Sequence, residues 1–355
     1  MAPRVSSELL LVGSLPAAST EEALRVGGEL YGDLVFALPD GETGPRALWA
    51  AYDHMTMLEP NEGIEVVEPG AVPPRHVEQI TVLGVRDGIG VGELTFDRWP
   101  RLDDAIASYE VFRRLRDEGA IPAHVRFQVG LPFNTSVMAS FKRDWEHDFA
   151  VVSAAYEEMF SREIRRLTDA IPPEDLVIQW DVCWEVLNIE GVISWMEGDA
   201  WKRFAGGVTR LTRMIPEQVL VGYHLCYGTF PAWPMYEARD MSLLVKMANY
   251  AVQESGRPVD FLHLAGPRDL RSEDSRFFAP LADLDTPDTR LYLGIVLPVD
   301  GVDGLRRRHA TASQYLDDFG VAMYCGFGRQ PGQDGMETMR EHRRVVAEVL
   351  AAPSN

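Results

Sequence analysis

Cysteine is scarce in this sequence, with three residues among 355, at positions 183, 226 and 325. An odd number of widely separated cysteines excludes a disulfide framework. We therefore expect a reducing, cytoplasmic setting in which the thiols remain available for a metal or for catalysis. Long hydrophobic runs are also absent. None approaches the roughly 20 residues of a transmembrane helix, and residues 1–7 lack the basic and then apolar pattern of a signal peptide.

Basic residues are outnumbered by acidic ones, with 34 Lys and Arg against 54 Asp and Glu, which gives a formal charge of -20. Binding to nucleic-acid phosphates needs clustered Lys and Arg, and anionic membrane surfaces attract the same residues. The charge therefore predicts that neither nucleic acid nor a membrane is a partner. The hydrophobic fraction of 46% is ordinary for a globular protein and supplies enough apolar material for a large core.

Apolar segments typical of buried strands alternate with amphipathic segments typical of helices, such as 19–30, 103–118 and 144–170. Nearly continuous apolar strands indicate a parallel sheet that is covered on both faces. No Gly-x-Gly-x-x-Gly follows the first strand, which disfavours a doubly wound dinucleotide-binding sheet. We predict the α/β class and a single (β/α)8 TIM barrel of residues 1–355. Its strands are expected to end near Ser14, Pro39, Gly130, Asp181, Cys226, Ala265, Pro298 and Cys325.

The region of about residues 61–100 interrupts this alternation. Ile80–Val85 and Gly90–Phe96 have the composition of strands, and Asp87-Gly88 between them is a dipeptide typical of hairpin turns. We therefore expect a hairpin-like insertion after the second strand of the barrel.

Two possible metal ligands stand at the end of the fifth predicted strand. His224 and Cys226 are two residues apart, so their side chains leave an extended chain on the same face. Cys325 ends the eighth strand, beside glycines that let the backbone approach a site closely. Barrels carry their reactive groups at the C-terminal ends of strands, so these side chains are expected to meet. One imidazole and two thiolates favour Zn²⁺, whereas burial as small hydrophobic residues is the alternative for the cysteines.

Polar residues follow other strands as well. Asp181 lies close to Trp180 and Trp184, so it is expected to be partly desolvated and to need a partner. Orienting a loop is its alternative role, and Asp40 and Glu42 are also typical turn residues of a glycine-rich loop. We predict that Asp181 and Tyr227 act in catalysis. The predicted substrate-binding residues are Ser14, Asp40, Glu42, Asn134, Gln179 and Trp184.

Four segments resemble the catalytic barrel of cobalamin-independent methionine synthase and its short relatives, which include epoxyalkane:coenzyme M transferase. The broader superfamily also contains uroporphyrinogen decarboxylase. The segments are Gly13-Ser14-Leu15-Pro16, Ile178-Gln179-Trp180-Asp181, His224-Leu225-Cys226-Tyr227 and Cys325-Gly326. Their order and approximate spacing hold over nearly the whole chain. The resemblance implies a (β/α)8 fold and a zinc ion held by His224, Cys226 and Cys325. It also implies that Ser14 and Asp181 lie where the family holds the amino-acid part of the acceptor thiol.

The chain departs from the family's pattern at two places. The glutamate that ends the family's sixth strand as a zinc ligand corresponds to Ala265 here. His263, two residues earlier on the same strand face, is the predicted fourth ligand, and Cys183 is the reserve candidate. Supporting another ligand or packing in the core is the alternative for His263. After the seventh strand, the histidine that pairs with the Asp181 equivalent in methionine synthase is missing. Homocysteine methylation therefore does not follow from the resemblance.

The residues and the resemblance together predict an enzyme. The leading hypothesis is a zinc-dependent transferase that moves a methyl or other alkyl group onto a small thiol, which is activated as a zinc thiolate. Zinc bound by two thiolates has damped Lewis acidity for hydrolysis, yet it still lowers the pKa of a substrate thiol. The expected partners are therefore a small-molecule thiol and an alkyl donor. The alternatives are a zinc-containing lyase, decarboxylase or hydrolase acting on a small carboxylated metabolite, and a non-catalytic binder.

Overall fold

Eight parallel strands curl into a nearly closed barrel in the computed structural model, which describes residues 4–71, 79–229, 234–266, 274–297, 300–327 and 335–350. The barrel strands are β1 (Leu9–Leu10), β2 (Ala37–Pro39), β5 (Arg126–Pro132), β6 (Leu176–Val182), β7 (Leu220–Leu225), β8 (Phe261–Ala265), β9 (Arg290–Val296) and β10 (Gly320–Met323). Their order around the sheet is β1-β10-β9-β8-β7-β6-β5-β2, and a bridge between Leu9 and Val35 brings the first and last strands together. The predicted (β/α)8 barrel is confirmed. Pro298, near which one strand is predicted to end, lies outside the described residues.

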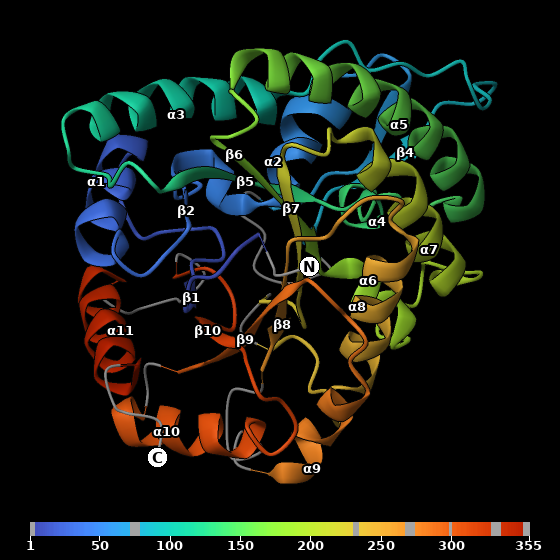
Figure 1. The fold of residues 1–355 in the computed structure, drawn as a ribbon. Helices are drawn as coiled ribbons and strands as arrows, with labels where there is room; N and C mark the ends of the chain where they lie inside the picture. Colours follow the sequence, from blue (N-terminus) through green and yellow to red (C-terminus); the bar gives the residue numbers. More distant parts are fainter. Residues whose placement is uncertain are drawn as a thin grey trace.

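Helices surround the barrel on the outside (Figure 1). Three of the longer helices begin at a side-chain cap, where Ser19, Asp144 or Asp199 accepts a hydrogen bond from the backbone N–H three residues later. The longer helices are α1 (Thr20–Tyr31), α3 (Pro100–Asp117), α5 (Trp145–Ala170), α7 (Ala200–Leu211), α8 (Ser242–Glu254), α10 (Gly301–Ala312) and α11 (Gly335–Leu350). The short ones are η1 (Gly44–Leu48), α2 (Ala50–Asp53), η2 (His54–Leu58), α4 (Asn134–Val137), α6 (Trp184–Ile189), η4 (Thr212–Met214), α9 (Ser275–Phe278) and η6 (Ala279–Asp283).

Apolar side chains pack in two places. The larger cluster lies between the strands and the helices and accounts for most of the core. A smaller cluster draws members from strands around the barrel, including Val177, Leu220, Phe261 and Tyr292. These four residues stand in the first half of their strands, so the cluster fills the barrel interior toward its N-terminal end. The opposite end, where the strands finish, is left to polar and ligand-bearing side chains.

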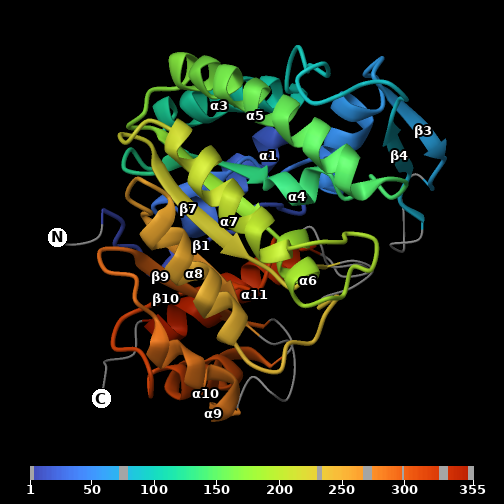
Figure 2. The same cartoon turned by 90° about the vertical axis from the view of Figure 1, so that its right-hand side faces the viewer.

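The insertion after β2 contains an antiparallel pair of strands, as predicted, but the pairing differs from the prediction. β3 (Ile64–Glu68) pairs with β4 (Val82–Val85), and Figure 2 shows the pair at the edge of the molecule, outside the barrel. The prediction of a strand over Gly90–Phe96 is wrong, because that segment forms turns. Gly88 and Gly92 have φ values of 85° and 87°, which favour turns over extended backbone. Residues 72–78 of the insertion lie outside the described residues.

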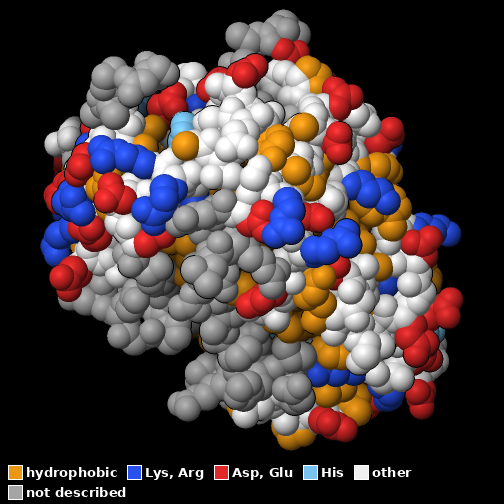
Figure 3. Space-filling view, turned by 90° about the horizontal axis from the view of Figure 1, so that it is seen from below, with side chains coloured by type: hydrophobic (Ala, Val, Ile, Leu, Met, Phe, Trp, Pro, Cys, Tyr) orange, Lys and Arg blue, Asp and Glu red, His pale blue; other side chains and the backbone are white. Residues whose placement is uncertain are grey.

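The surface carries charges of both signs. On the face seen in Figure 3, the Lys and Arg side chains of the described residues are interspersed with Asp and Glu. Among the described residues, none of the helices combines the length and the apolar character needed to cross a membrane.

Candidate metal centre

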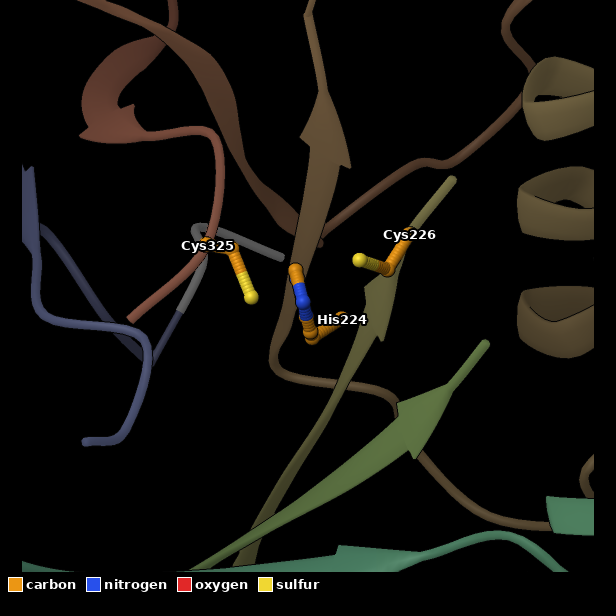
Figure 4. Close-up of side chains that lie close together, drawn as sticks. All are labelled: His224, Cys226 and Cys325. Carbon is orange, nitrogen blue, oxygen red and sulfur yellow. The ribbon is translucent and has the colours of Figure 1, made fainter. Parts of the chain in front are cut away.

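His224, Cys226 and Cys325 meet at the C-terminal end of the barrel. His224 is the fifth residue of β7, Cys226 follows directly after that strand, and Cys325 comes two residues after β10. One ligand atom from each side chain lies within 4.8 Å of the others, and His224 and Cys226 are buried. Figure 4 shows the three side chains converging from these two segments. The structure thus brings together two sulfurs and an imidazole from the ends of two strands, as the spacing predicts.

The thiol of Cys226 is held in a setting that disfavours its ionised form. Burial raises its pKa well above the ordinary value, and a hydrogen bond with the Cys183 side chain raises it further. Contact with Cys325 and a hydrogen bond from the Gly228 N–H to Cys226 Sγ, at 3.4 Å, act in the opposite direction but are smaller. Without a cation nearby, this thiol therefore stays protonated at neutral pH. A bound metal ion would remove that penalty, which is the setting expected of a ligand.

Cys183 stands directly after β6 and borders the same cavity as the three converging side chains. Its side chain reaches that of Cys226, but it is not a member of the close group formed by His224, Cys226 and Cys325. The structure therefore leaves Cys183 beside the candidate centre, as a neighbour of one ligand.

His263, the predicted fourth ligand, does not join the close group. Its ring is fully buried, and burial lowers its pKa to about 3. Its Nε2 lies 2.9 Å from the backbone carbonyl oxygen of Met323, and its Nδ1 lies 2.6 Å from Nδ1 of His224. The strand register explains this contact, because His263 on β8 pairs directly with His224 on β7. His263 therefore lies against the ring of His224, with both of its nitrogens engaged.

Asp181 lies one strand further along, on β6, where it pairs with His224 in the sheet. Its Oδ1 accepts a hydrogen bond from Gln179 Nε2 at 2.9 Å, and its Oδ2 accepts one from the indole N–H of Trp49 at 3.2 Å. Gln179 also donates to the carbonyl oxygen of Val12 at 2.6 Å, so its amide is fixed in turn. Two donors thus orient this nearly buried carboxylate.

Glu42 brings a second carboxylate to the same wall. A side-chain carbon placed on Gly130 would lie 3.2 Å from Asp181 Oδ2 and 3.4 Å from Glu42 Oε1, so both oxygens face one small region. Glu42 itself has a φ of 47°, a conformation that is uncommon for residues other than glycine. Strain of this kind is often found in functional loops. Two neighbouring carboxylates with little solvent make a region suited to a cation.

Asp40 has a different place from Glu42. Its Oδ1 accepts a hydrogen bond from the backbone N–H of Glu42 at 3.0 Å, and its Oδ2 pairs with Arg46. Asp40 is not among the residues that border the cavity. These contacts match the turn-forming alternative, with Asp40 shaping the loop that presents Glu42.

A cavity of about 270 Å³ borders the ligand group and the two carboxylates. Ser14 and Trp184, both predicted to bind substrate, contribute to its wall. Ser14 Oγ is buried and has no hydrogen-bond partner among the described residues. A side-chain carbon on Gly326 would overlap this oxygen, so the glycine after Cys325 leaves room for Ser14 beside the ligands.

Besides Asp40 and His263, three further predicted site residues do not border the cavity. Asn134 begins α4, where its Oδ1 accepts from the N–H of Thr135 at 2.9 Å. Gln179 acts on the cavity through Asp181, as described above. Tyr227 is buried, which raises the pKa of its phenol well above the ordinary value. The structure does not bring the Asn134, Gln179 or Tyr227 side chains to the cavity wall.

Trp49 is a cavity residue that the sequence does not reveal. It lies between η1 and α2, has a φ of 53°, and donates its indole N–H to Asp181. Its carbonyl oxygen accepts a hydrogen bond from Arg101 at 2.8 Å, and Arg101 forms a buried ion pair with Asp53. This anchored loop holds the indole against the Asp181 carboxylate. No strand pattern or motif marks Trp49, so only the fold identifies it.

Solved structures resemble this chain over most of its length. No model of a known protein family matches the sequence, and no curated protein matches it. A structure from Listeria monocytogenes, described as a vitamin-B12-independent methionine synthase, matches with 13% identity and a TM-score of 0.57, covering 93% of this chain and 86% of that one. A B12-independent methionine synthase from a Shewanella species, solved in complex with selenomethionine, matches with 13% identity and a TM-score of 0.56, covering 98% of both chains. These likenesses agree with the resemblance seen in the sequence, and at this identity they establish the fold.

Proposed function

We propose that this chain is a zinc-dependent transferase that moves a methyl or other alkyl group onto a small thiol. The observation that carries the proposal is the group of His224, Cys226 and Cys325 at the border of a cavity. The description of the structural neighbours as methionine synthases supports the methyl-transfer class. The free cysteines fit the reducing cytoplasm that we expect for such a thiol enzyme.

The donor set fits zinc. An imidazole and two thiols within 4.8 Å match the nitrogen and sulfur ligands that zinc prefers, and burial of His224 and Cys226 limits competition from water. Ala265 ends β8 without a donor atom, so three protein ligands would leave a position for substrate. When bound, zinc would lower the pKa of a substrate thiol and hold it as a nucleophilic thiolate at neutral pH.

Two carboxylates in the same cavity would select the acceptor. Asp181, held by Gln179 and Trp49, and Glu42 together offer carboxylate oxygens to a cation. We infer that this cation is the ammonium group of an amino thiol, with Ser14 Oγ as a further polar contact. The neighbour from Shewanella binds selenomethionine, an amino acid with a methylated selenium, which is the kind of product that such a transfer gives.

Apolar side chains complete the cavity and limit water at the reacting sulfur. Trp184 and Leu187 of α6 border the cavity together with Leu48 and Met235. An alkyl group that enters along this wall would contact these apolar side chains. They would also exclude water that competes for the alkyl carbon. Tyr227 has no part in this scheme, because its phenol does not border the cavity.

The alternative is a lyase, decarboxylase or hydrolase that acts on a small carboxylated metabolite at the same metal. Three ligands and an open position would also suit a bound water. The carboxylates of Asp181 and Glu42, however, face one region of the cavity and would repel an anionic substrate. We therefore favour thiol alkylation.

Metal content and turnover test the proposal. Wild-type protein prepared with zinc is expected to retain about one equivalent after desalting, and both Cys226→Ser and Cys325→Ser should lose most of it. Cys183→Ser is the matched control, because it removes a neighbouring thiol that is outside the close group. The zinc-loaded wild type should alkylate an amino thiol from a small methyl or alkyl donor. Absence of stoichiometric zinc, or zinc retention unaffected by both ligand substitutions, would refute the proposal.

A further inference from the structure

We propose that His263 is a positioning residue that fixes the tautomer of His224, so that Nε2 of His224 is the nitrogen offered to the metal. The inference rests on the proposed metal centre. It replaces the sequence-based prediction that His263 is itself a ligand. The observation behind it is a chain of contacts that joins three strands, from the carbonyl of Met323 through His263 to His224.

The direction of each hydrogen bond follows from the first partner in this chain. The carbonyl oxygen of Met323 can only accept, so His263 Nε2, at 2.9 Å, must carry the proton. In a neutral imidazole the other nitrogen is then an acceptor. His263 Nδ1 lies 2.6 Å from His224 Nδ1, so the proton in that contact belongs to His224. His224 Nε2 is left with a lone pair and no proton.

The neutral form of His263 follows from its surroundings. The ring is fully buried, and its nitrogens contact an imidazole and a backbone carbonyl, both of which are uncharged. An imidazolium ion in such a place would lack the anionic partner that buried charges need. The neutral ring donates its Nε2–H to the Met323 carbonyl oxygen, and its Nδ1 then accepts the hydrogen bond from Nδ1–H of His224.

The barrel is built to accommodate this ring. His263 is on β8 and Met323 is on β10, and β9 lies between these two strands. Gly294 of β9 has no side chain, and a side-chain carbon there would lie 3.0 Å from His263 Nε2. The imidazole therefore crosses β9 to reach β10. Met323 is two residues before Cys325, so the contact joins the strand that presents His224 to the segment that presents Cys325.

The consequence for the metal centre is preorganisation. A histidine ligand usually donates its second N–H to a neighbouring acceptor, which sets the ring orientation and raises its basicity as a ligand. His263 supplies this acceptor to His224. Removal of such an acceptor typically weakens metal binding by about 10- to 100-fold.

The tautomer can be read without a metal, from long-range ¹⁵N–¹H spectra of the full-length, metal-free protein labelled at its eight histidines. Wild type is expected to show His224 as the Nδ1–H tautomer and His263 as the Nε2–H tautomer. His263→Leu should release His224 from the Nδ1–H form, whereas His263→Asn keeps an acceptor oxygen near the same place and should preserve it. An Nε2–H tautomer of His224 in wild type, or an Nδ1–H tautomer that persists in His263→Leu, would overturn the inference.

Zinc affinity gives the second readout, measured by competition with a chromophoric chelator at neutral pH. We expect His263→Leu to bind zinc about 10- to 100-fold more weakly than wild type, and His263→Asn to recover most of that loss. His342→Leu is the control, because it removes another fully buried imidazole, on α11, and should leave the affinity unchanged. Circular dichroism checks the fold of each variant.

The two proposals fail in different ways. If wild type binds no zinc, the proposed function fails, while the tautomers still decide the role of His263. If His263→Leu is folded and binds zinc as tightly as wild type, the role of His263 is overturned and the zinc centre stands.

Discussion

At the scale of single residues, the proposed selectivity of the cavity depends on Asp181. Its two oxygens accept hydrogen bonds from Gln179 and Trp49, so the carboxylate is already oriented before a ligand arrives. Preorganised charge of this kind interacts with an ammonium group without a further ordering cost. Glu42 adds negative charge beside it. The proposed acceptor would be recognised by its charge at these carboxylates and by its sulfur at the metal centre.

This account predicts the effect of Asp181→Asn, which keeps the size of the side chain and removes its charge. A hydrogen bond to a charged group contributes about 1.5–3 kcal/mol, so an amino thiol should bind about 10- to 100-fold more weakly to the zinc-loaded variant. Calorimetric titration measures the change. The matched control is the same thiol without its amino group, which should bind both proteins equally. Equal losses for the two thiols would contradict the assignment.

The residues of the centre were predictable to different degrees. His224 and Cys226 are two apart at a strand end, and Cys325 ends another strand, so periodicity and barrel geometry locate them. Trp49 was not predictable, because it lies between two short helical segments and is placed by a buried ion pair from α3. His263 was predicted as a fourth ligand, and the structure places it against the ring of His224, outside the close group, since sequence gives the strand face but not the direction of a ring.

At the scale of elements, the packing of α1 depends on close contact with the segment before β5. Gly28 lies in the C-terminal half of α1, and a side-chain carbon there would overlap the backbone carbonyl oxygen of Ala120. A backbone atom cannot rotate away as a side chain can. Gly206 in α7 is a useful contrast, because a carbon at that position would meet only the guanidinium end of Arg210.

We therefore predict opposite effects for two identical substitutions. Gly28→Ala should lower the free energy of unfolding by roughly 1–3 kcal/mol, because the helix has to move away from the Ala120 segment. Gly206→Ala should leave stability unchanged or raise it by up to about 1 kcal/mol, because alanine favours the helix. Urea unfolding of both variants beside wild type measures the difference. Equal destabilisation by the two substitutions would show that this contact does not limit the packing of α1.

The strands of the barrel were easier to predict from the sequence than those of the insertion. The eight barrel strands were predictable because each is apolar and is followed by a turn or a functional residue. The hairpin was predicted in the right region with the wrong partner. Ile64–Glu68 is largely exposed and lacks a clear apolar pattern, so the sequence does not mark it as the partner of Val82–Val85, the strand of the pair that contacts α5.

At the scale of the whole molecule, buried histidines couple stability to pH. Burial lowers the pKa of His54 to about 4 and that of His342 to about 3, whereas an unfolded histidine titrates near 6.5. Below pH 6.5 the unfolded chain therefore binds protons that the native state does not. The stabilising contribution of each neutral imidazole is fully present above pH 6.5 and is lost as the pH falls toward the native pKa.

His342→Leu should reduce this dependence. Between pH 7 and pH 5 the titration of one such histidine in the unfolded state changes stability by about 2 kcal/mol. The loss of unfolding free energy over that interval should thus be smaller by about this amount in the variant than in wild type. Urea unfolding of both proteins at the two pH values provides the test. An identical loss would mean that His342 is already protonated in the native protein at pH 5.

The predictions for the whole chain concern its fold, its division into domains and its partners. The α/β class and the barrel are confirmed, and the solved structures that it resembles cover most of its length. That residues 1–355 act as one domain, and that the partners are a small thiol and an alkyl donor, stay predictions. Neither follows from the strand pattern, because periodicity and strand ends locate elements and do not define domain limits or partners.

X-ray absorption at the zinc K-edge during titration with an amino thiol tests the central claim most directly. The zinc-loaded protein should show one imidazole nitrogen and two sulfur scatterers, from His224, Cys226 and Cys325. Adding the thiol should introduce a third sulfur at about 2.3 Å, and the thiol without its amino group should require a higher concentration for the same change. A zinc environment without sulfur, or one that the thiol leaves unchanged, would contradict the account.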